Sequence, residues 1–330
     1  MVRLRRVSSR SAGWARVRQG RGFRYLDENG EPLVEVDVER CKGLVIPPAW
    51  RDVWIRPADN GHLQAVGTDE AGRRQYLYHP AWRERRDQQK FAHMELFARR
   101  LLTHRRDARR DLGGDEPTLE RVATAAFSLL DLGMFRIGSE RYAEENGSYG
   151  LTTIERSHVT PHGRGLGISY VAKSGQLVAV TVRDDRVVDL LVALRRRRSG
   201  DRLLAYRCGA RWHDLSAEEL NAYIKERLGG EFSAKDFRTW RGTVVAALEL
   251  ARSDAHTPTA RKRAAAAAMR EVAQHLGNTP AVARSSYVDP RVVDLFEDGI
   301  TVAPSHRRVS PGAPVSRKLE RDVLRLLRHT

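Results

Sequence analysis

The sequence predicts an α+β protein: a small β-rich N-terminal domain, then a larger, mainly α-helical domain with one small antiparallel sheet. Two observations predict this division. Short extended runs separated by turn residues fill roughly the first 85 residues. Further along, apolar residues recur at helical spacing, interrupted by two alternating apolar runs within 168–182. The length of 330 residues also fits two domains of about 150 residues each.

Four segments are expected along the chain. Residues 1–22 are basic and rich in Arg, Ser and Gly, which predicts a loose arm. The β-rich domain would span 23–88 and the helical domain 89–302. Residues 303–330 would form a Pro-, Ser- and Gly-rich linker and a short amphipathic helix at 317–328.

Turn signals organise the β-rich domain. Asn29-Gly30 lies between the extended runs 24–26 and 33–36, which predicts a hairpin. A second hairpin is expected around the turn residues at 69–72. The other predicted strands are, in order, 53–55, 62–67 and 74–78.

Helices are predicted wherever apolar residues follow the period of 3.6, and caps refine their ends. Ser216 and Glu219 form a capping box at one start, and Pro280 follows Thr279 at another. In the sheet of this domain, Lys173 lies at the tip of a hairpin between 168–172 and 177–182. The predicted helices are, in order, 88–110, 119–132, 140–146, 216–229, 233–252, 260–276 and one that opens at Thr279.

The charge balance favours a polyanionic partner. Lys and Arg total 58 against 42 Asp and Glu, a net charge of +16. A genome base composition that favours Arg codons would give a similar excess of basic residues. Charge alone also does not distinguish a nucleic acid partner from an anionic membrane surface. The run Arg195–Arg198 is interpreted as a solvated loop.

Several classes of protein are excluded. No apolar run approaches about 18 residues, so no membrane span is expected. The N-terminus lacks the apolar segment of a secretory signal. Cys41 and Cys208 match no metal-binding spacing, which indicates a reducing, cytoplasmic compartment and no structural zinc.

Three clusters of residues, together with the Lys173 hairpin, carry a resemblance to a known family. The first begins at Arg136-Ile137-Gly138, the second is the run 235–239 around Arg238, and the third places Asn278 nine residues before Tyr287. In this order the chain resembles the type IB DNA topoisomerases, in the compact form found in poxviruses and bacteria. The segments 44–50, 53–55 and 75–80 agree, so the resemblance covers about residues 30–300.

The resemblance implies the catalytic fold shared with the tyrosine recombinases, in which 23–88 is a DNA-clamp domain and 89–302 the catalytic domain. It implies that supercoiled duplex DNA is relaxed by transient cleavage and religation of one strand through a 3′-phosphotyrosyl intermediate. Neither ATP nor a metal is implied, and no cofactor. The partner would be duplex DNA and not a membrane, held by a monomer acting as a clamp at the nucleoid.

The resemblance also assigns roles that suit each residue type. Tyr287 would attack the phosphodiester, and covalent storage of the bond energy removes any need for ATP. Arg136 and Arg238 would hold the non-bridging oxygens through forked guanidiniums. Lys173 would protonate the departing 5′-oxygen, since Lys can release a proton and Arg effectively cannot.

Asn278 departs from the family, which usually has His at this position. An amide can donate a hydrogen bond to a phosphate oxygen, but it cannot titrate or carry charge. We therefore expect Asn278 to act by donation only. The residues that the resemblance places against DNA are Gln75, Tyr76, Tyr78, Ser139, Arg141 and Tyr142. Tyr76 and Tyr78 flank Leu77 and would share one face of a strand, where half-burial in the sheet is an equally good interpretation.

Two alternatives remain open from the sequence. A tyrosine recombinase shares the Arg, Lys, Arg and Tyr chemistry, but usually has a helical N-terminal domain and a His three residues before the second Arg. Here that position is Lys235. A non-catalytic DNA-binding protein of the same fold is the other alternative.

Overall fold

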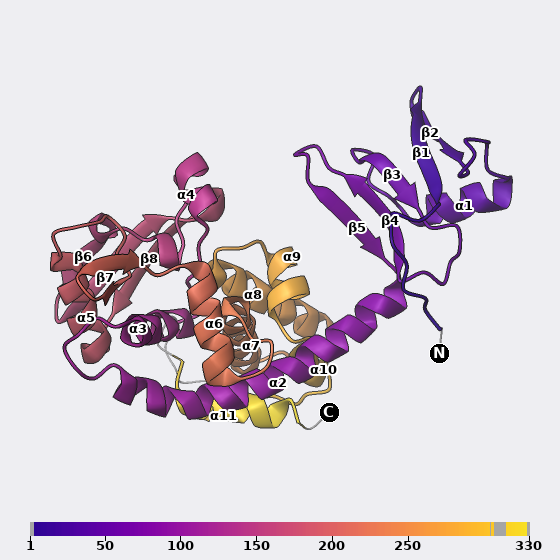
Figure 1. The fold of residues 1–330 in the computed structure, drawn as a ribbon. Coiled ribbons are helices and arrows are strands. Elements are labelled where there is room, and N and C mark those ends of the chain that lie inside the picture. Colours follow the sequence, from indigo (N-terminus) through magenta and orange to yellow (C-terminus); the bar gives the residue numbers. More distant parts are fainter. Residues whose placement is uncertain (1–2, 304, 307–314, 329–330) are drawn as a thin grey trace. The chain divides into compact units, whose positions relative to one another are not determined.

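The chain divides into two compact units, residues 1–92 and 93–330 (Figure 1). The structure, a computed structural model, describes residues 3–303, 305–306 and 315–328, without the side chains of 86–88, 90, 91, 141 and 142. The long helix α2 (Pro80–Asp111) runs through the boundary between the units. The division expected after residue 88 therefore falls inside a continuous helix.

The N-terminal unit is built on a five-stranded antiparallel sheet in the order β2-β1-β3-β4-β5. Its elements are β1 (Trp14–Gln19), β2 (Gly22–Leu26), α1 (Glu35–Gly43), β3 (Arg51–Ile55), β4 (Leu63–Thr68) and β5 (Arg74–Tyr78). The expected hairpin around 69–72 is confirmed as β4 paired with β5, and the expected strand at 53–55 lies within β3. Trp14, Tyr25, Val53 and Ile55 form the centre of a small core.

Two expectations in this unit are wrong. The segment 1–22 is not simply a loose arm, because β1 pairs with both β2 and β3 and buries Trp14. The extended run 33–36 does not pair with 24–26 as a strand. The turn at Asn29 is present, Pro32 bridges Leu26, and the Leu33 N–H donates to the Tyr25 carbonyl oxygen at 3.1 Å. The pairing goes no further because α1 begins at Glu35.

The second unit is mainly helical, as expected. Its helices after α2 are α3 (Leu119–Asp131), α4 (Glu140–Asn146), α5 (Asp185–Arg196), α6 (Ala217–Leu228), α7 (Ala234–Arg252), α8 (Pro258–Leu276), α9 (Pro280–Val282), α10 (Pro290–Glu297) and α11 (Arg317–Leu326). The strands β6 (Val159–His162), β7 (Gly165–Val171) and β8 (Leu177–Val182) form an antiparallel sheet, and β9 (Ala205–Cys208) pairs with β10 (Arg211–Asp214). Both capping interactions of Ser216 with Glu219 are made, as predicted.

Sequence reasoning missed α1, α5, α10 and the β9–β10 hairpin, and it was wrong about Arg195–Arg198. Arg195 and Arg196 end α5, whereas Arg197 is buried. The guanidinium of Arg197 donates to the carbonyl oxygens of Ser199 (2.8 Å) and Leu203 (2.9 Å). Burial of this charge is tolerated because carbonyl acceptors replace the lost water.

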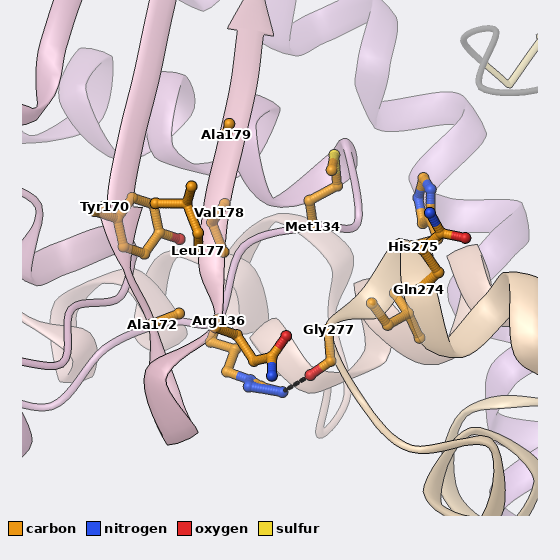
Figure 2. Close-up of a pocket in the computed structure, with 12 residues that line it drawn as sticks. Met134, Arg136, Tyr170, Ala172, Leu177, Val178, Ala179, Gln274, His275 and Gly277 are labelled. Carbon is orange, nitrogen blue, oxygen red and sulfur yellow. Dashed lines mark hydrogen bonds between the residues drawn. The ribbon is translucent and has the colours of Figure 1, made fainter.

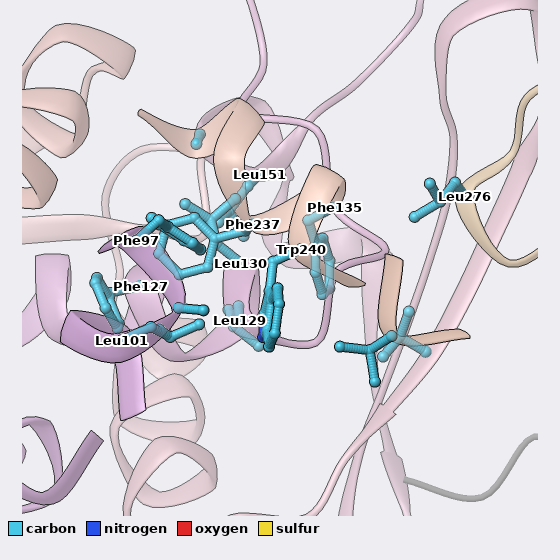
Figure 3. Packing of buried hydrophobic residues seen from close by; sticks show 14 of the residues in the cluster. Phe97, Leu101, Phe127, Leu129, Leu130, Phe135, Leu151, Phe237, Trp240 and Leu276 are labelled. Atoms are coloured by element: carbon cyan, nitrogen blue, oxygen red, sulfur yellow. The ribbon is translucent and has the colours of Figure 1, made fainter. Parts of the chain in front are cut away.

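Helix α7 runs through the core of the second unit (Figure 3). Phe237 packs edge-on against Phe97 and Phe127, with ring centroids 5.0 and 4.9 Å apart. Trp240, one turn further along, is 1% exposed. Such dense aromatic packing fixes α7 in place, and with it any side chain that α7 carries.

Candidate active site

Five side chains that are far apart in the sequence line one open cavity of about 600 Å³ in the second unit. They are the five residues expected to act together: Arg136, Lys173, Arg238, Asn278 and Tyr287. The segments that supply them are the α3–α4 loop, the β7–β8 hairpin, helix α7 and the chain that follows α8. The fold therefore brings together residues that lie up to 151 positions apart in the sequence.

Arg136 is held at the edge of this cavity by a tight pair of loops. The backbone N–H of Leu151 donates to the carbonyl oxygen of Arg136 at 2.7 Å. A Cβ on Gly150 would lie 2.4 Å from the Cα of Gly138, so the close approach of the two loops requires glycine. The Arg136 Nη2 donates to the carbonyl oxygen of Gly277 at 2.8 Å (Figure 2). Figure 2 shows this bond in a smaller neighbouring cavity of about 230 Å³, which Arg136 and Gly277 also line.

Arg238 lies in the second turn of α7 and is 3% exposed. Its guanidinium donates to the carbonyl oxygens of Met134 (3.0 Å) and Leu276 (2.5 Å). Burial, and secondly the charge of Arg136, lower the pKa of Arg238 from its usual value. Two guanidiniums facing one cavity make it strongly attractive to an anion.

Asn278 follows the left-handed C-cap Gly277 of α8, and its N–H donates to the carbonyl oxygen of Ala273 at 2.9 Å. Its side-chain oxygen accepts from Arg136 Nη2 at 2.8 Å. Within the described part of the chain, the buried nitrogens Asn278 Nδ2 and Arg238 Nε have no hydrogen-bond partner. Buried donors of this kind are costly unless an acceptor joins them, so these two nitrogens are candidates to bind an acceptor.

Tyr287 ends a short π-helical turn, Ala283–Tyr287, that continues from α9. Thr279 caps this segment by accepting from the N–H of Val282 at 3.3 Å. The Tyr287 ring centroid lies 5.2 Å from the guanidinium carbon of Arg238. Single π-helical turns are rare, and they are frequently found at functional sites.

Lys173 lies at the tip of the β7–β8 hairpin, where the sequence predicted it. The tip is a tight turn, closed by the Ala172 N–H donating to the Gln176 carbonyl oxygen at 2.7 Å. Ser174 and Gly175 both have left-handed backbone angles, with φ of 64° and 71°. The alternating apolar residues of β7 and β8 determine the register in which the two strands pair, and so the position of the tip.

Lys235 also lines the cavity and was not among the expected site residues. It is exposed and lies one helical turn before Arg238 on α7. The spacing of three residues was the available signal, since residues at i and i+3 share a helix face.

Comparison with known proteins decides the family of this chain. Residues 79–302 match the family described as eukaryotic DNA topoisomerase I, catalytic core, and residues 22–69 match bacterial DNA topoisomerase IB, N-terminal domain. The chain belongs to the type IB DNA topoisomerases. DNA topoisomerase 1B of Acanthamoeba polyphaga mimivirus is 30% identical over 297 residues, which cover 87% of this chain and 88% of that protein.

Membership confirms the family resemblance and the α+β fold class expected from the sequence. A type IB topoisomerase is an isomerase whose substrate is DNA, which it relaxes. In the part of the chain that the structure describes, no helix is long and apolar enough to cross a membrane. Among the same residues, no group of three or more His, Cys, Asp or Glu side chains is arranged to hold a metal ion.

The residues expected to contact DNA lie in two places in this topoisomerase. In the N-terminal unit, Tyr76 and Tyr78 lie on one face of β5 with stacked rings 6.2 Å apart, as strand alternation predicts. Tyr76 is 47% exposed, which favours a contact surface over a packed sheet face. Gln75 points to the other face and donates to Asp69 Oδ2 at 2.8 Å.

In the second unit, the remaining expected contacts lie at the start of α4. Ser139 is exposed, and its carbonyl oxygen accepts from the N–H of Ala143 at 3.1 Å in the first turn. The side chains of Arg141 and Tyr142 lie outside the described residues.

Proposed function

We propose that this topoisomerase cleaves and rejoins one DNA strand in the 600 Å³ cavity, through a 3′-phosphotyrosyl bond to Tyr287. The observation that carries the proposal is the meeting of five side chains of suitable chemistry in that cavity, two of them with unpartnered buried donors among the described residues. Nucleophilic attack on a phosphodiester needs groups of these kinds. The cavity offers a nucleophile, two guanidiniums, an amide donor and an ammonium.

In the proposed cleavage step, the Tyr287 hydroxyl oxygen attacks phosphorus and its proton passes to solvent. The bond from phosphorus to the 5′-oxygen breaks, and the 5′-oxygen takes a proton from Lys173. Arg136, Arg238 and Asn278 donate to the non-bridging oxygens, whose charge increases in the transition state. Religation is the reverse, with the 5′-hydroxyl attacking the phosphotyrosine.

Arg238 would contribute in a second way. Its guanidinium carbon lies 5.2 Å from the Tyr287 ring centroid. A fixed positive charge at that distance would stabilise the negative charge that develops on the Tyr287 oxygen as it leaves during religation. Because carbonyl oxygens hold Arg238 in place, this charge is in position before DNA binds.

Lys235 is proposed to support Lys173. Both ammonium groups belong to residues that line the cavity, one from α7 and one from the β7–β8 hairpin. The positive charge of Lys235 would help to hold the phosphodiester beside Lys173 while Lys173 gives up its proton. In this arrangement, side chains alone supply the acid catalysis. We therefore also propose that the protein relaxes DNA without ATP or a metal ion.

DNA binding is proposed to involve both units. The exposed aromatic face of β5 would contact bases and backbone, and the start of α4 would contact phosphates. Monomeric action and closure around the duplex are part of the same proposal. The net charge of +16 would accelerate the encounter with DNA and make binding strongly salt-dependent.

A plasmid assay tests the proposal. Purified protein is mixed with negatively supercoiled plasmid in excess EDTA and without ATP. We expect complete relaxation by wild type and none by Tyr287→Phe. Relaxation that needs a divalent cation, or that persists in Tyr287→Phe, would overturn the proposed mechanism while leaving family membership intact.

A further inference from the structure

The C-terminal helix α11 packs against the catalytic unit although it lies outside the region, 79–302, that matches the topoisomerase core. Figure 1 shows α11 alongside α2. Leu319 and Val323 are buried, and Glu320 is 1% exposed. The Glu320 carboxylate accepts from Trp240 Nε1 at 3.0 Å and pairs with Arg105. The helix is therefore attached to α7, the helix that carries Arg238.

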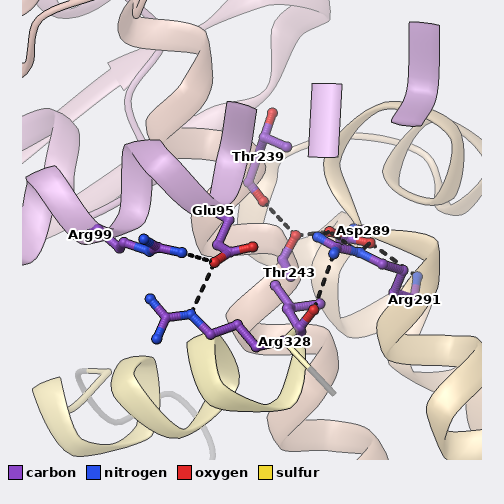
Figure 4. A network of polar contacts seen from close by, with 8 residues as sticks. Glu95, Arg99, Thr239, Thr243, Asp289, Arg291 and Arg328 are labelled. Atoms are coloured by element: carbon purple, nitrogen blue, oxygen red, sulfur yellow. Dashed lines mark hydrogen bonds and ion pairs between the residues drawn. The ribbon is translucent and has the colours of Figure 1, made fainter. Parts of the chain in front are cut away.

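The last turn of α11 makes a second attachment (Figure 4). The carbonyl oxygen of Leu327 accepts from Arg291 Nη1 at 3.1 Å. The same guanidinium holds Asp289 in a two-point ion pair, with Nε to Oδ1 at 3.1 Å and Nη2 to Oδ2 at 2.8 Å. Because the pair is bidentate, it fixes orientation as well as distance.

Asp289 lies two residues after Tyr287 and is completely buried. Its N–H donates to Thr243 Oγ1 on α7 at 3.1 Å, and its carboxylate caps the start of α10 through the Arg291 N–H at 3.0 Å. The Tyr287 backbone itself lies against Gly242 on α7. The chain on the C-terminal side of the nucleophile is thus held by α7 on one side and by Arg291 on the other.

We propose that Arg291 is a positioning residue for DNA cleavage: it couples the segment that carries Tyr287 to the C-terminal helix, so that α11 supports the active site. Arg291 is not among the residues that line the cavity of the proposed reaction. It acts by fixing Asp289, and therefore the direction in which the Tyr287 side chain leaves the backbone. This inference rests on the proposed role of Tyr287.

The test must separate positioning from stability. Removing only the guanidinium leaves the Asp289 carboxylate buried without a charged partner, which destabilises the fold. We therefore pair Arg291→Gln with Asp289→Asn in one double variant, since Asn also caps helices well. Arg291→Lys keeps the charge but loses the two-point geometry. Arg325→Gln, an exposed change on α11, is the matched control.

For each full-length variant we measure the melting temperature, the Kd for duplex DNA and the single-turnover cleavage rate at saturating DNA, well below the melting temperature. We expect the double variant and Arg291→Lys to cleave at least 10-fold more slowly, with Kd within 2-fold of wild type, while Arg325→Gln cleaves as wild type does. Cleavage within 2-fold of wild type in the folded variants, or a loss explained by Kd alone, would overturn the inference.

The two proposals fail in different ways. If Tyr287→Phe still forms covalent adducts, the proposed function fails. If Tyr287→Phe is inactive but both Arg291 variants cleave normally, only the positioning role of Arg291 fails. If the double variant is unfolded at the assay temperature, Arg291→Lys alone decides the outcome.

Discussion

Arg136 orients the side chain of Asn278: Nη2 of Arg136 lies 2.8 Å from Oδ1 of Asn278. A guanidinium can only donate, so the oxygen of the amide must face it. The amide NH₂ of Asn278 then faces away from Arg136, and in the described structure it is buried without a partner. In the proposed mechanism, this orientation would let a neutral amide donate to the phosphate at the position where the sequence resemblance implies His.

The orientation of Asn278 predicts a graded series of variants. Asn278→Ala removes the donor and should slow single-turnover cleavage about 100-fold, as loss of one transition-state donor typically does. Asn278→Asp keeps the contact with Arg136 but turns an acceptor toward the phosphate, so it should be slower still. Asn278→His should retain most of the rate. Equal cleavage by Asn278→Ala and wild type would contradict the role.

The general-acid role of Lys173 predicts a chemical rescue. Lys173→Ala should lose most cleavage of ordinary DNA, and Lys173→Arg should not restore it, because Arg retains its proton. Both variants should cleave a substrate whose bridging 5′-oxygen is replaced by sulfur, since a thiolate leaves without protonation. Asn278→Ala serves as the control that sulfur should not rescue. A Lys173 variant that stays slow on the sulfur substrate would argue against acid catalysis.

Close packing at Gly242 predicts that a single methyl group displaces the nucleophile. A Cβ at this position would lie 2.5 Å from the carbonyl oxygen of Tyr287. We expect Gly242→Ala to reduce the cleavage rate at least 10-fold while Kd for DNA changes little. Gly43→Ala, whose added Cβ meets open space, is the matched control. Wild-type cleavage by a folded Gly242→Ala protein would show that the contact does not position Tyr287.

Burial of His275 predicts a pH-dependent stability. Burial, with the charges of Arg241 and Arg238, lowers the pKa of His275 to about 4. The unfolded chain takes up this proton near pH 6.5 and the folded chain does not, so stability is lost as pH falls from about 6.5 toward 4. Between pH 7 and pH 5, the free energy of unfolding measured in urea should fall by about 2 kcal/mol more for wild type than for His275→Gln. Equal losses in the two proteins would contradict this.

The elements that sequence predicted well are those whose stabilising contacts are local. The β7–β8 hairpin and the capping box at Ser216 follow from alternation and from side chains within three residues of one another. Strand β1 was missed because Arg16 lies on its buried face and breaks the alternation. The guanidinium of Arg16 donates to carbonyl oxygens of Ile46 (2.8 Å) and Pro47 (2.9 Å), a compensation that only the folded chain supplies.

The candidate site was predictable only in part. The order of the five residues identified them by family resemblance, but periodicity and composition alone would not have separated Arg136 and Arg238 from the other arginines. Arg197 was expected to be solvated but is buried. Its burial depends on carbonyl groups of the loop that follows it, and the sequence pattern does not reveal them. The attachment of α11 through Arg291 depends on packing between distant segments and has no local signature.

Trapping of the covalent intermediate tests the central claim most directly. Protein is incubated with a duplex whose cleaved strand loses a short 3′ fragment by dissociation, so that religation is prevented, and the reaction is stopped with SDS. We expect wild type to become linked to the 3′ end of the retained strand through Tyr287, and Tyr287→Phe to form no adduct. An adduct that persists unchanged in Tyr287→Phe, or no adduct from wild type, would contradict it.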